Sequence, residues 1–380
     1  MNNLALFLIE NIELPFTKVE ITGSCFVYRQ KDDQITALSI RSIIRFIKTL
    51  LFKFSGVKLP IVFELGAATF VDKLTYVVFE CLCDYLIEEK NYKVKLKMNV
   101  RKHIHTAGIE SSPLMLLTNG DDAHLNKFKQ SFKFEIYRNH YRRVITKENL
   151  EKPDFLCKVM DDVAYFQNAF DVNPDCREDI AEVIIELIGN ASEHGGSNCL
   201  VDFDIATSYS RRGSDKEFLG INIVIINLSE KLLGTALKQL ICNRDISEPR
   251  YIAVKEAYSN HTHFFGADYL EEDFFNLTAF QHKISGRSAN MTTGGTGLTK
   301  LIQSLETRSE AHMCYVTSGE RTIMFAPEYL RYNEDGWLGF NESNDFLHAK
   351  PDLSLISRNC YKFPGTAYNL NFVLQREDKI

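Results

Sequence analysis

The chain has 380 residues, enough for about two to three domains, and its hydrophobic fraction of 45% and charged fraction of 25% are those of an ordinary soluble protein. The net charge of −6 gives no electrostatic reason to expect a nucleic-acid partner. The N-terminus lacks a signal-peptide pattern, no apolar stretch is long enough to span a bilayer, and the nine scattered cysteines do not suggest a disulfide framework, so we expect reduced thiols in the cytoplasm.

The first 110 residues alternate between strand-like and helix-like patterns, which predicts a small α/β domain over residues 1–110. Helices are expected at 36–54 and 73–88, and strands at 5–10, 18–28, 59–65 and 92–98. The first of these helices carries several cations and could lie on an anionic membrane surface. Its aliphatic stripe is explained more simply as a packing face, so we do not expect a membrane partner.

Residues 111–150 are predicted to be a connector. Turn signals occur at 111–113 and 119–122, and the run 137–143 mixes cations with aromatic side chains. That mixture could contact phosphates and bases, or it could coat a connecting segment. Because no wider basic patch accompanies it, we favour a solvated connector.

The helix predicted for 178–194 carries polar side chains where a core face begins. Glu186, Asn190 and His194 are four residues apart, so they fall close together on one face of a helix. An apolar stripe lies beside them, formed by Ile180, Val183, Ile184, Leu187, Ile188 and Ala191. Polar groups at the edge of a buried face cost free energy unless something pairs with them, as a metal-bound phosphate would. The alternative is an amphipathic helix whose polar margin is tolerated.

Two glycine-containing turns follow further along the chain. Residues 294–300 read Gly-Gly-Thr-Gly-Leu-Thr-Lys and lead into an apolar, helix-like run at 301–305. Such a turn presents free N–H groups and the positive end of a helix dipole to an anion, although a plain flexible loop has the same composition. The spacing does not fit a P-loop. Near the C-terminus, Gly365 and Thr366 lead into a strand-like run that ends at 374.

Together, the helix at 178–194, the glycine-rich turn at 294–299 and the Gly365-Thr366 turn resemble, in order and spacing, three boxes of the GHKL ATPase superfamily. Its members include gyrase-type topoisomerases, heat-shock chaperones, histidine kinases, MutL-type repair proteins and anti-sigma-factor serine kinases. The resemblance covers roughly residues 150–380. It implies an ATP-binding domain over 151–380 with the fold of a two-layer α/β sandwich.

The resemblance also assigns roles by position. Asn190 matches the asparagine that binds Mg²⁺ together with phosphate oxygens and water, and Glu186 matches the glutamate that orients or deprotonates the attacking water. His194 lies where several members keep a residue near the phosphates or the lid. Thr366 matches a threonine near the adenine pocket. The backbone expected to wrap the phosphates comprises Gly294, Gly295, Thr296, Gly297 and Leu298.

One box departs from the family pattern. Its members usually carry Asp-x-Gly-x-Gly after a strand, and the aspartate accepts a hydrogen bond from the adenine amino group. Here the strand-like run 221–226 leads to Asn227 in place of the aspartate and to Ser229 in place of the first glycine. The Asn227 oxygen can still accept, but its NH₂ needs another partner. The alternative is that Asn227 only begins a turn.

Between the boxes, residues of about 243–293 are expected to form a lid. Its cations could reach a γ-phosphate when the lid closes, and Lys283 and Arg287 are the preferred candidates because they are nearest to the glycine-rich box. The other lid cations include Arg250, and the lid also holds His261. For each one, a surface charge is the alternative reading.

The strand–turn–helix order of residues 59–88 is similar to that of STAS-like domains, which accompany anti-sigma-factor kinases. The combined resemblance implies a Mg²⁺- and ATP-binding regulatory protein that hydrolyses ATP slowly and switches conformation or partner. Two alternatives stay open: a serine/threonine kinase of the anti-sigma type, and a nucleotide sensor without catalysis. The expected partners are a nucleotide and another protein, and a homodimer is left open.

Overall fold

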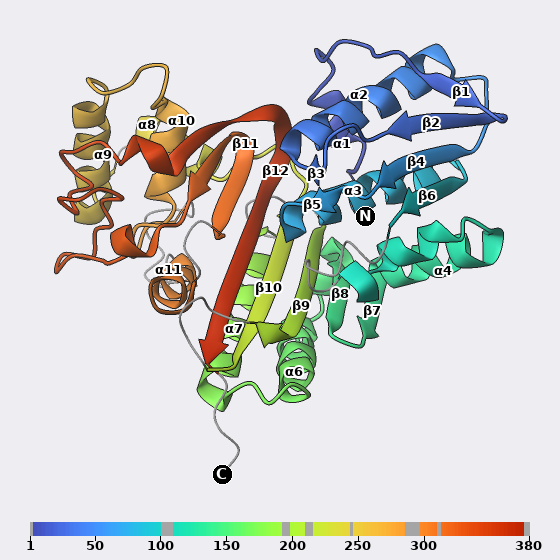
Figure 1. The fold of residues 1–380 in the computed structure, drawn as a ribbon. Coiled ribbons are helices and arrows are strands. Elements are labelled where there is room, and N and C mark those ends of the chain that lie inside the picture. The colour runs from blue at the N-terminus through green and yellow to red at the C-terminus, as the bar shows by residue number, and fades with distance from the viewer. Residues whose placement is uncertain are drawn as a thin grey trace.

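The computed structural model describes residues 3–99, 109–191, 198–209, 216–243, 246–285, 297–309 and 313–375. These residues form a mixed α/β protein around a four-stranded sheet, a six-stranded sheet and a two-stranded sheet (Figure 1). None of the helices described in these ranges is long and apolar enough to cross a membrane.

The N-terminal part is built on the four-stranded sheet, in the order β1-β2-β4-β6. Its strands are β1 (Glu20–Thr22), β2 (Cys25–Arg29), β4 (Ile61–Gly66) and β6 (Val94–Met98). β1 pairs with β2 antiparallel, whereas β2, β4 and β6 are parallel, so a helix crosses over between each parallel pair. These helices are α2 (Ala37–Lys53) and α3 (Lys73–Asp84), the latter extended by a π-helical turn, η1 (Tyr85–Glu89). The two-stranded sheet joins β3 (Gln34–Ile35) to β5 (Thr69–Phe70).

Both helices expected in this part are confirmed, but the strand expected at 5–10 is wrong. That segment forms a short helix, α1 (Leu6–Ile9), whose Leu6, Phe7 and Leu8 are all buried. A short apolar run has no periodicity that separates a buried strand from a buried helical turn.

The segment expected to be a connector, 111–150, consists instead of regular elements. They are η3 (Ile109–Ser111), η4 (Pro113–Thr118), α4 (Asp122–Lys133), β7 (Phe134–Tyr137), β8 (His140–Ile145) and α5 (Lys147–Leu150). β7 and β8 belong to the six-stranded sheet. These strands could not be predicted from the sequence for two reasons. β7 is an edge strand with exposed aromatic residues. β8 buries charged residues whose ionic partners come close only in the folded chain.

The six-stranded sheet is antiparallel in the order β11-β12-β10-β9-β8-β7. Its remaining strands are β9 (Cys199–Tyr209), β10 (Phe218–Asn227), β11 (Tyr315–Met324) and β12 (Ile356–Gln375). β10 is central, and its last residue, Asn227, lies opposite Thr366 of β12 and Cys199 of β9. The strand expected at 221–226 is confirmed and is longer at both ends.

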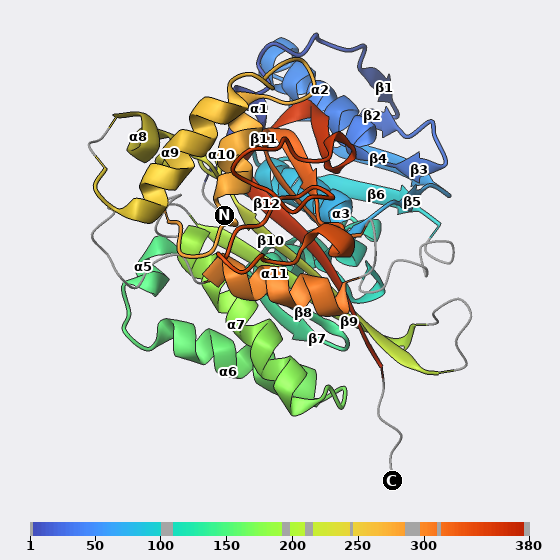
Figure 2. The ribbon, with the colours of Figure 1, turned by 90° about the vertical axis from the view of Figure 1, so that its left-hand side faces the viewer.

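Layers cover both faces of this sheet. Ile221, Ile223 and Ile225 of β10 belong to one core with residues of α6 (Phe155–Asn168), α7 (Pro174–Asn190) and α11 (Gly297–Arg308). These three helices lie on the same face of the sheet (Figure 2). Val224 and Ile226 join the core of the N-terminal part on the other face. A strand buried on both faces has no alternation of apolar and polar residues, which explains the continuous apolar run of β10.

A third region lies beyond the sheet and contains α8 (Thr235–Asn243), α9 (Pro249–His261) and α10 (Glu271–Thr278). These helices pack with the irregular segment between β11 and β12, which includes η6 (Pro327–Tyr329) and η7 (Leu353–Leu355). Aromatic rings dominate the contact, among them Phe274 stacked on Phe346, which also stacks on Trp337.

Candidate functional site

The polar residues of two predicted boxes meet at the end of β10, on the face of the sheet that carries α6, α7 and α11. Gly365 and Thr366 do not precede a strand, as the sequence predicted, but lie in the middle of β12, at an irregularity in its pairing with β11. We call Asn227, Ser229, Ser318, Gly365 and Thr366 the sheet-end cluster. Asn227 and Ser318 both lie opposite Thr366 in the strand register. The Ser318 hydroxyl donates to the Gly365 carbonyl at 3.0 Å and lies 3.0 Å from Oγ1 of Thr366. Because that proton is used, Thr366 is the donor in the second contact.

Gly365 allows β12 to lie close to the last residue of β10 and to the segment that follows it. Its φ of +101° lies in a region that favours glycine, and a Cβ atom would overlap the Asn227 carbonyl oxygen and lie 2.7 Å from the Ser229 amide nitrogen. The Ser229 amide donates to the Pro364 carbonyl at 3.4 Å, so the chain after β10 runs directly along this part of β12. A glycine at position 365 of β12 is therefore a structural requirement of the cluster.

The Asn227 side chain connects the cluster to the end of α7. Its Nδ2 donates to the carbonyl oxygen of Ala191 at 2.8 Å, which is the partner that its NH₂ required. Ala191 directly follows Asn190, so this contact brings the last turn of α7 to the end of β10. With Nδ2 committed, Oδ1 is the atom left to accept, and no described group donates to it.

The start of α11 lies beside the middle of α7. Lys300 forms an ion pair with Glu182, and Arg308 forms one with Asp179 at 2.6 Å. Residue numbers rise along α11 as they fall along α7, so the two helices run in opposite senses. The N-terminal turn of α11 therefore lies nearer to the C-terminal half of α7 than the rest of α11 does.

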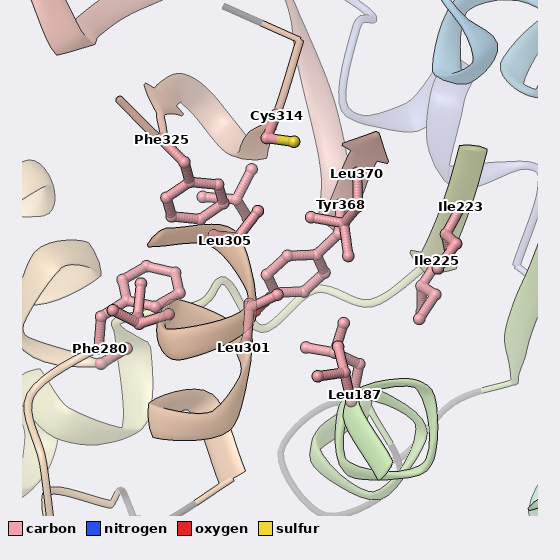
Figure 3. Packing of buried hydrophobic residues seen from close by; sticks show 14 of the residues in the cluster. Leu187, Ile223, Ile225, Phe280, Leu301, Leu305, Cys314, Phe325, Tyr368 and Leu370 are labelled. Atoms are coloured by element: carbon pink, nitrogen blue, oxygen red, sulfur yellow. The ribbon is translucent and has the colours of Figure 1, made fainter. Parts of the chain in front are cut away.

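Apolar packing holds these elements over the sheet. Leu187 of α7, Leu301 of α11 and Tyr368 of β12 converge in one buried cluster (Figure 3). All six residues of the apolar stripe predicted for the helix are buried, which confirms the helix face. Glu186 and Asn190 are half-buried at its margin.

Several predicted residues lie outside the described ranges: His194, Arg287, Gly294, Gly295 and Thr296. Gly297 and Leu298 are the first residues of α11. No group of three or more His, Cys, Asp or Glu side chains that could hold a metal ion occurs in the described part of the chain. A metal ion here would depend on Asn190 for a protein ligand, with phosphate and water completing the set, as Mg²⁺ accepts.

Residues 246–285 of the expected lid are folded into α9, α10 and packed turns. Arg250, one of its cations, donates to the carbonyl oxygens of His282, Asp335 and Gly336, and its guanidinium lies 3.8 Å from the centre of the Trp337 ring. Burial also lowers the pKa of Arg250. These contacts hold the Arg250 side chain in the fold, so its guanidinium is not available to a phosphate.

The lid histidine His261 is also structural. It is buried, and its ring nitrogens lie 2.7 Å from the Tyr269 hydroxyl and 2.9 Å from the Phe346 carbonyl oxygen. Burial lowers its pKa, so the neutral ring is favoured.

Lys283 remains a candidate cation because it is exposed beside the start of α11. Its neighbour His282 lies 3.2 Å from the Thr299 hydroxyl in the first turn of that helix. Burial lowers the pKa of His282, and the charges of Arg250 and Lys283 lower it further.

Sequence reasoning missed Ser318, whose contact with Thr366 depends on the pairing of β11 with β12, for which the sequence holds no local signal. It also missed a buried ion network on the opposite face of the sheet. Nζ of Lys73, in α3, lies 2.5 Å from Oδ1 of Asp202 and also pairs with Asp204. The spacing Asp202-x-Asp204 within an apolar strand is the signal that could have indicated it.

The ion network continues into β8. His140 Nε2 lies 2.8 Å from Oδ2 of Asp202, and the Arg142 Nε–H donates to the same oxygen at 2.5 Å. Arg142 also pairs with Glu80 of α3. Burial opposes ionisation of Asp202, but Arg142, His140 and Lys73 outweigh it and hold the pKa of this carboxyl well below its ordinary value.

Comparison with protein-family models, with curated proteins and with solved structures finds no match for this chain. The GHKL and STAS-like resemblances therefore rest on the motifs alone. The structural evidence for function lies in the sheet-end cluster and in the ends of the neighbouring helices.

Proposed function

We propose that this chain is a Mg²⁺- and ATP-binding regulatory protein that hydrolyses ATP slowly and uses the cycle to switch conformation or partner. The observation that carries the proposal is the contact of Asn227 with the carbonyl oxygen of Ala191. It joins the helix with the predicted metal ligand to the strand with the predicted base-reading residue. The sequence motifs and this contact support one site.

The fixed orientation of the Asn227 amide favours adenine. An exocyclic amino group donates to Oδ1, whereas a base with a carbonyl group in that position would set two acceptors against each other. An asparagine can thus replace the aspartate of the family, because the Ala191 carbonyl decides which atom is presented.

The helix ends supply groups for the phosphates. The first turn of α11 has N–H groups without partners in the helix and carries the positive end of the helix dipole. Among the described cations of the expected lid, Lys283 is the nearest to this turn by chain position, and its neighbour His282 lies 3.2 Å from Thr299. Lys300, within the turn, is paired with Glu182. Asn190 would hold the metal ion, which when bound neutralises charge on the phosphate oxygens.

Glu186 is the proposed general base. It lies one helical turn before Asn190, on the same half-buried margin of α7. A carboxylate in this position accepts the proton of a water molecule that attacks the terminal phosphate.

Titration with ATP and Mg²⁺, together with phosphate release, tests the proposal on wild type, Asn190→Ala, Glu186→Ala and the control Glu178→Ala, an exposed glutamate of the same helix. We expect Asn190→Ala to lose Mg²⁺-dependent binding and Glu186→Ala to bind normally while releasing phosphate at least about a hundredfold more slowly. The control should behave as wild type. Failure of ATP to bind wild type contradicts the proposal.

The kinase alternative is favoured by the same Glu186, because a partner hydroxyl could take the place of water, and by the STAS-like order of the N-terminal part. Incubation with γ-labelled ATP and candidate partner proteins separates the two, since only the kinase transfers label to protein. Binding with neither phosphate release nor transfer identifies the third alternative, a nucleotide sensor.

A further inference from the structure

An apolar cavity of about 460 Å³ opens in the N-terminal part, between α1, the end of α2 and the segment from η1 to β6. Its volume lies within the range of small-molecule sites, which are commonly apolar with a few placed polar groups. Its wall consists mainly of aliphatic and aromatic side chains, among them Leu8, Leu51, Phe52, Tyr85 and Tyr92.

The wall contains two charged side chains, Lys58 and Lys90, and no carboxylate. Nζ of Lys58 donates to the Lys90 carbonyl oxygen at 2.9 Å and lies 4.3 Å from the centre of the Tyr92 ring. Nζ of Lys90 lies 5.1 Å from the centre of the Tyr85 ring. Among the described residues neither lysine forms an ion pair, so the wall carries two positive charges without a directly paired carboxylate.

Apolar side chains of the wall are also left in contact with water. Ile9 is 59% exposed, Ile12 is 48% exposed and Phe52 is 58% exposed. Such a group of exposed apolar residues beside cations without a directly paired carboxylate is typical of a binding site for a ligand with an apolar body and one anionic end.

We propose that this cavity binds an amphipathic carboxylate of the medium-chain fatty acid type. Its hydrocarbon chain covers Leu8, Ile9 and Phe52, and its carboxylate lies at Lys58 and Lys90. The apolar volume fits the hydrocarbon chain of the ligand, and the two ammonium groups complement its carboxylate. The site is separate from the sheet-end cluster and does not depend on the proposed ATP binding.

Calorimetric titration of the full chain with decanoate tests this assignment, with decanol and decyltrimethylammonium as probes of the same chain length, all below the concentration at which they form micelles. We expect decanoate to bind at least tenfold more tightly than decanol and the cation not to bind. The double variant Lys58→Met, Lys90→Met should weaken decanoate binding at least tenfold. Lys93→Met, which removes an exposed lysine paired with Asp122, is the matched control and should bind as wild type.

Two cavity-filling variants, Ala5→Phe and Ser55→Phe, place a ring in the wall and should each abolish binding, while thermal melts establish that they fold. Undiminished binding to both folded variants would overturn the assignment, as would equal affinity for decanoate and decanol. Binding to vesicles of anionic phospholipid without binding of free decanoate would also overturn it, in favour of a membrane-contacting surface.

Discussion

At the residue scale, the side chain of Asn227 has the most consequences for the site. Its NH₂ donates to Ala191 at the end of α7, and its backbone pairs with β9 and β12. The residue is buried, so each of its polar atoms has to be satisfied by the protein or by a ligand. The direction of this single hydrogen bond leaves Oδ1 of Asn227 as the acceptor of the side chain.

The contact predicts that replacing Asn227 with aspartate, the residue of the GHKL pattern, is harmful in this chain. Asn227→Asp replaces the donor with a carboxylate oxygen that faces the Ala191 carbonyl oxygen, so we expect the free energy of unfolding to fall by about 1–3 kcal/mol. Denaturant unfolding measures the loss. Asn168→Asp is the control, because Asn168 is exposed and accepts from Arg177, so its replacement should change stability by less than about 0.5 kcal/mol. Equal stability of Asn227→Asp and wild type would show that the amide does not donate.

A second residue, Asp84, predicts how stability depends on pH. Burial raises its pKa to about 6, so the folded chain holds this proton more tightly than the unfolded chain does. The contribution of Asp84 to stability is then greatest below its ordinary pKa, falls as pH rises toward about 6, and is level above it. The whole effect is about 3 kcal/mol.

Asp84→Asn mimics the protonated form and should lack this dependence. We expect the variant to match wild type near pH 4 and to exceed it above pH 6, as measured by urea unfolding across that range. A constant difference between the two proteins at every pH would contradict the raised pKa.

At the scale of elements, the middle of β12 controls how the sheet-end cluster is assembled. Gly365→Ala combines a strained positive φ with overlap against Asn227, so we expect a loss of about 2–5 kcal/mol in the free energy of unfolding. Gly189→Ala is the matched control in α7, where an added Cβ meets nothing within 4 Å. It should stabilise the chain by about 0.5–1 kcal/mol, because alanine is the better helix former. Unfolding followed by Trp337 fluorescence measures both, and a tolerated Gly365→Ala would contradict the close approach of the strands.

The elements that the sequence predicted well are those whose signal is local. The apolar stripe of α7 has helical periodicity, and the continuous apolar run of β10 identifies a strand. The turn expected at Gly365-Thr366 is wrong, because both residues lie within β12. Long-range pairing decided what could not be predicted. β7 and β8 were predicted to be a connector because the segment contains charged residues such as Arg142. Arg142 can be buried in the core because it forms ion pairs with Asp202 and Glu80. Likewise, the structural role of Arg250 could not be predicted, because Trp337 lies beside its guanidinium only in the folded chain.

At the scale of the whole molecule, the N-terminal part and the six-stranded sheet share a core. Leu200, Val224 and Ile226 of the sheet pack in the same cluster as α2 and α3. Polar contacts cross the same boundary: the Leu74 amide donates to Oδ1 of Asn369 at 3.1 Å, and the Tyr315 hydroxyl donates to Asp72 at 2.8 Å. The strands that carry Asn227 and Thr366 thus have the N-terminal part against their other face. We expect the two parts to unfold together.

The buried ion network is the most sensitive point of this boundary. Lys73→Met leaves Asp204 buried without its cationic partner, and removing one member of a buried pair costs about 3–5 kcal/mol. Lys93→Met is again the control, since its pair with Asp122 is exposed and should contribute less than about 1 kcal/mol. Adding Asp204→Asn to Lys73→Met should recover part of the loss, because the unpaired carboxylate is then removed.

Two probes in one unfolding experiment test whether the N-terminal part and the six-stranded sheet unfold cooperatively. Trp337 reports on the helical region beyond the sheet, and the buried thiols of Cys81 and Cys83 report on α3. In urea, Trp337 fluorescence and the labelling of these two thiols, identified by mass spectrometry, should give one midpoint in wild type and one lower midpoint in Lys73→Met. Labelling of the two thiols at a urea concentration that leaves Trp337 unchanged would show that the N-terminal part opens alone. The shared core would then contribute too little to couple that part to the sheet carrying the proposed nucleotide site.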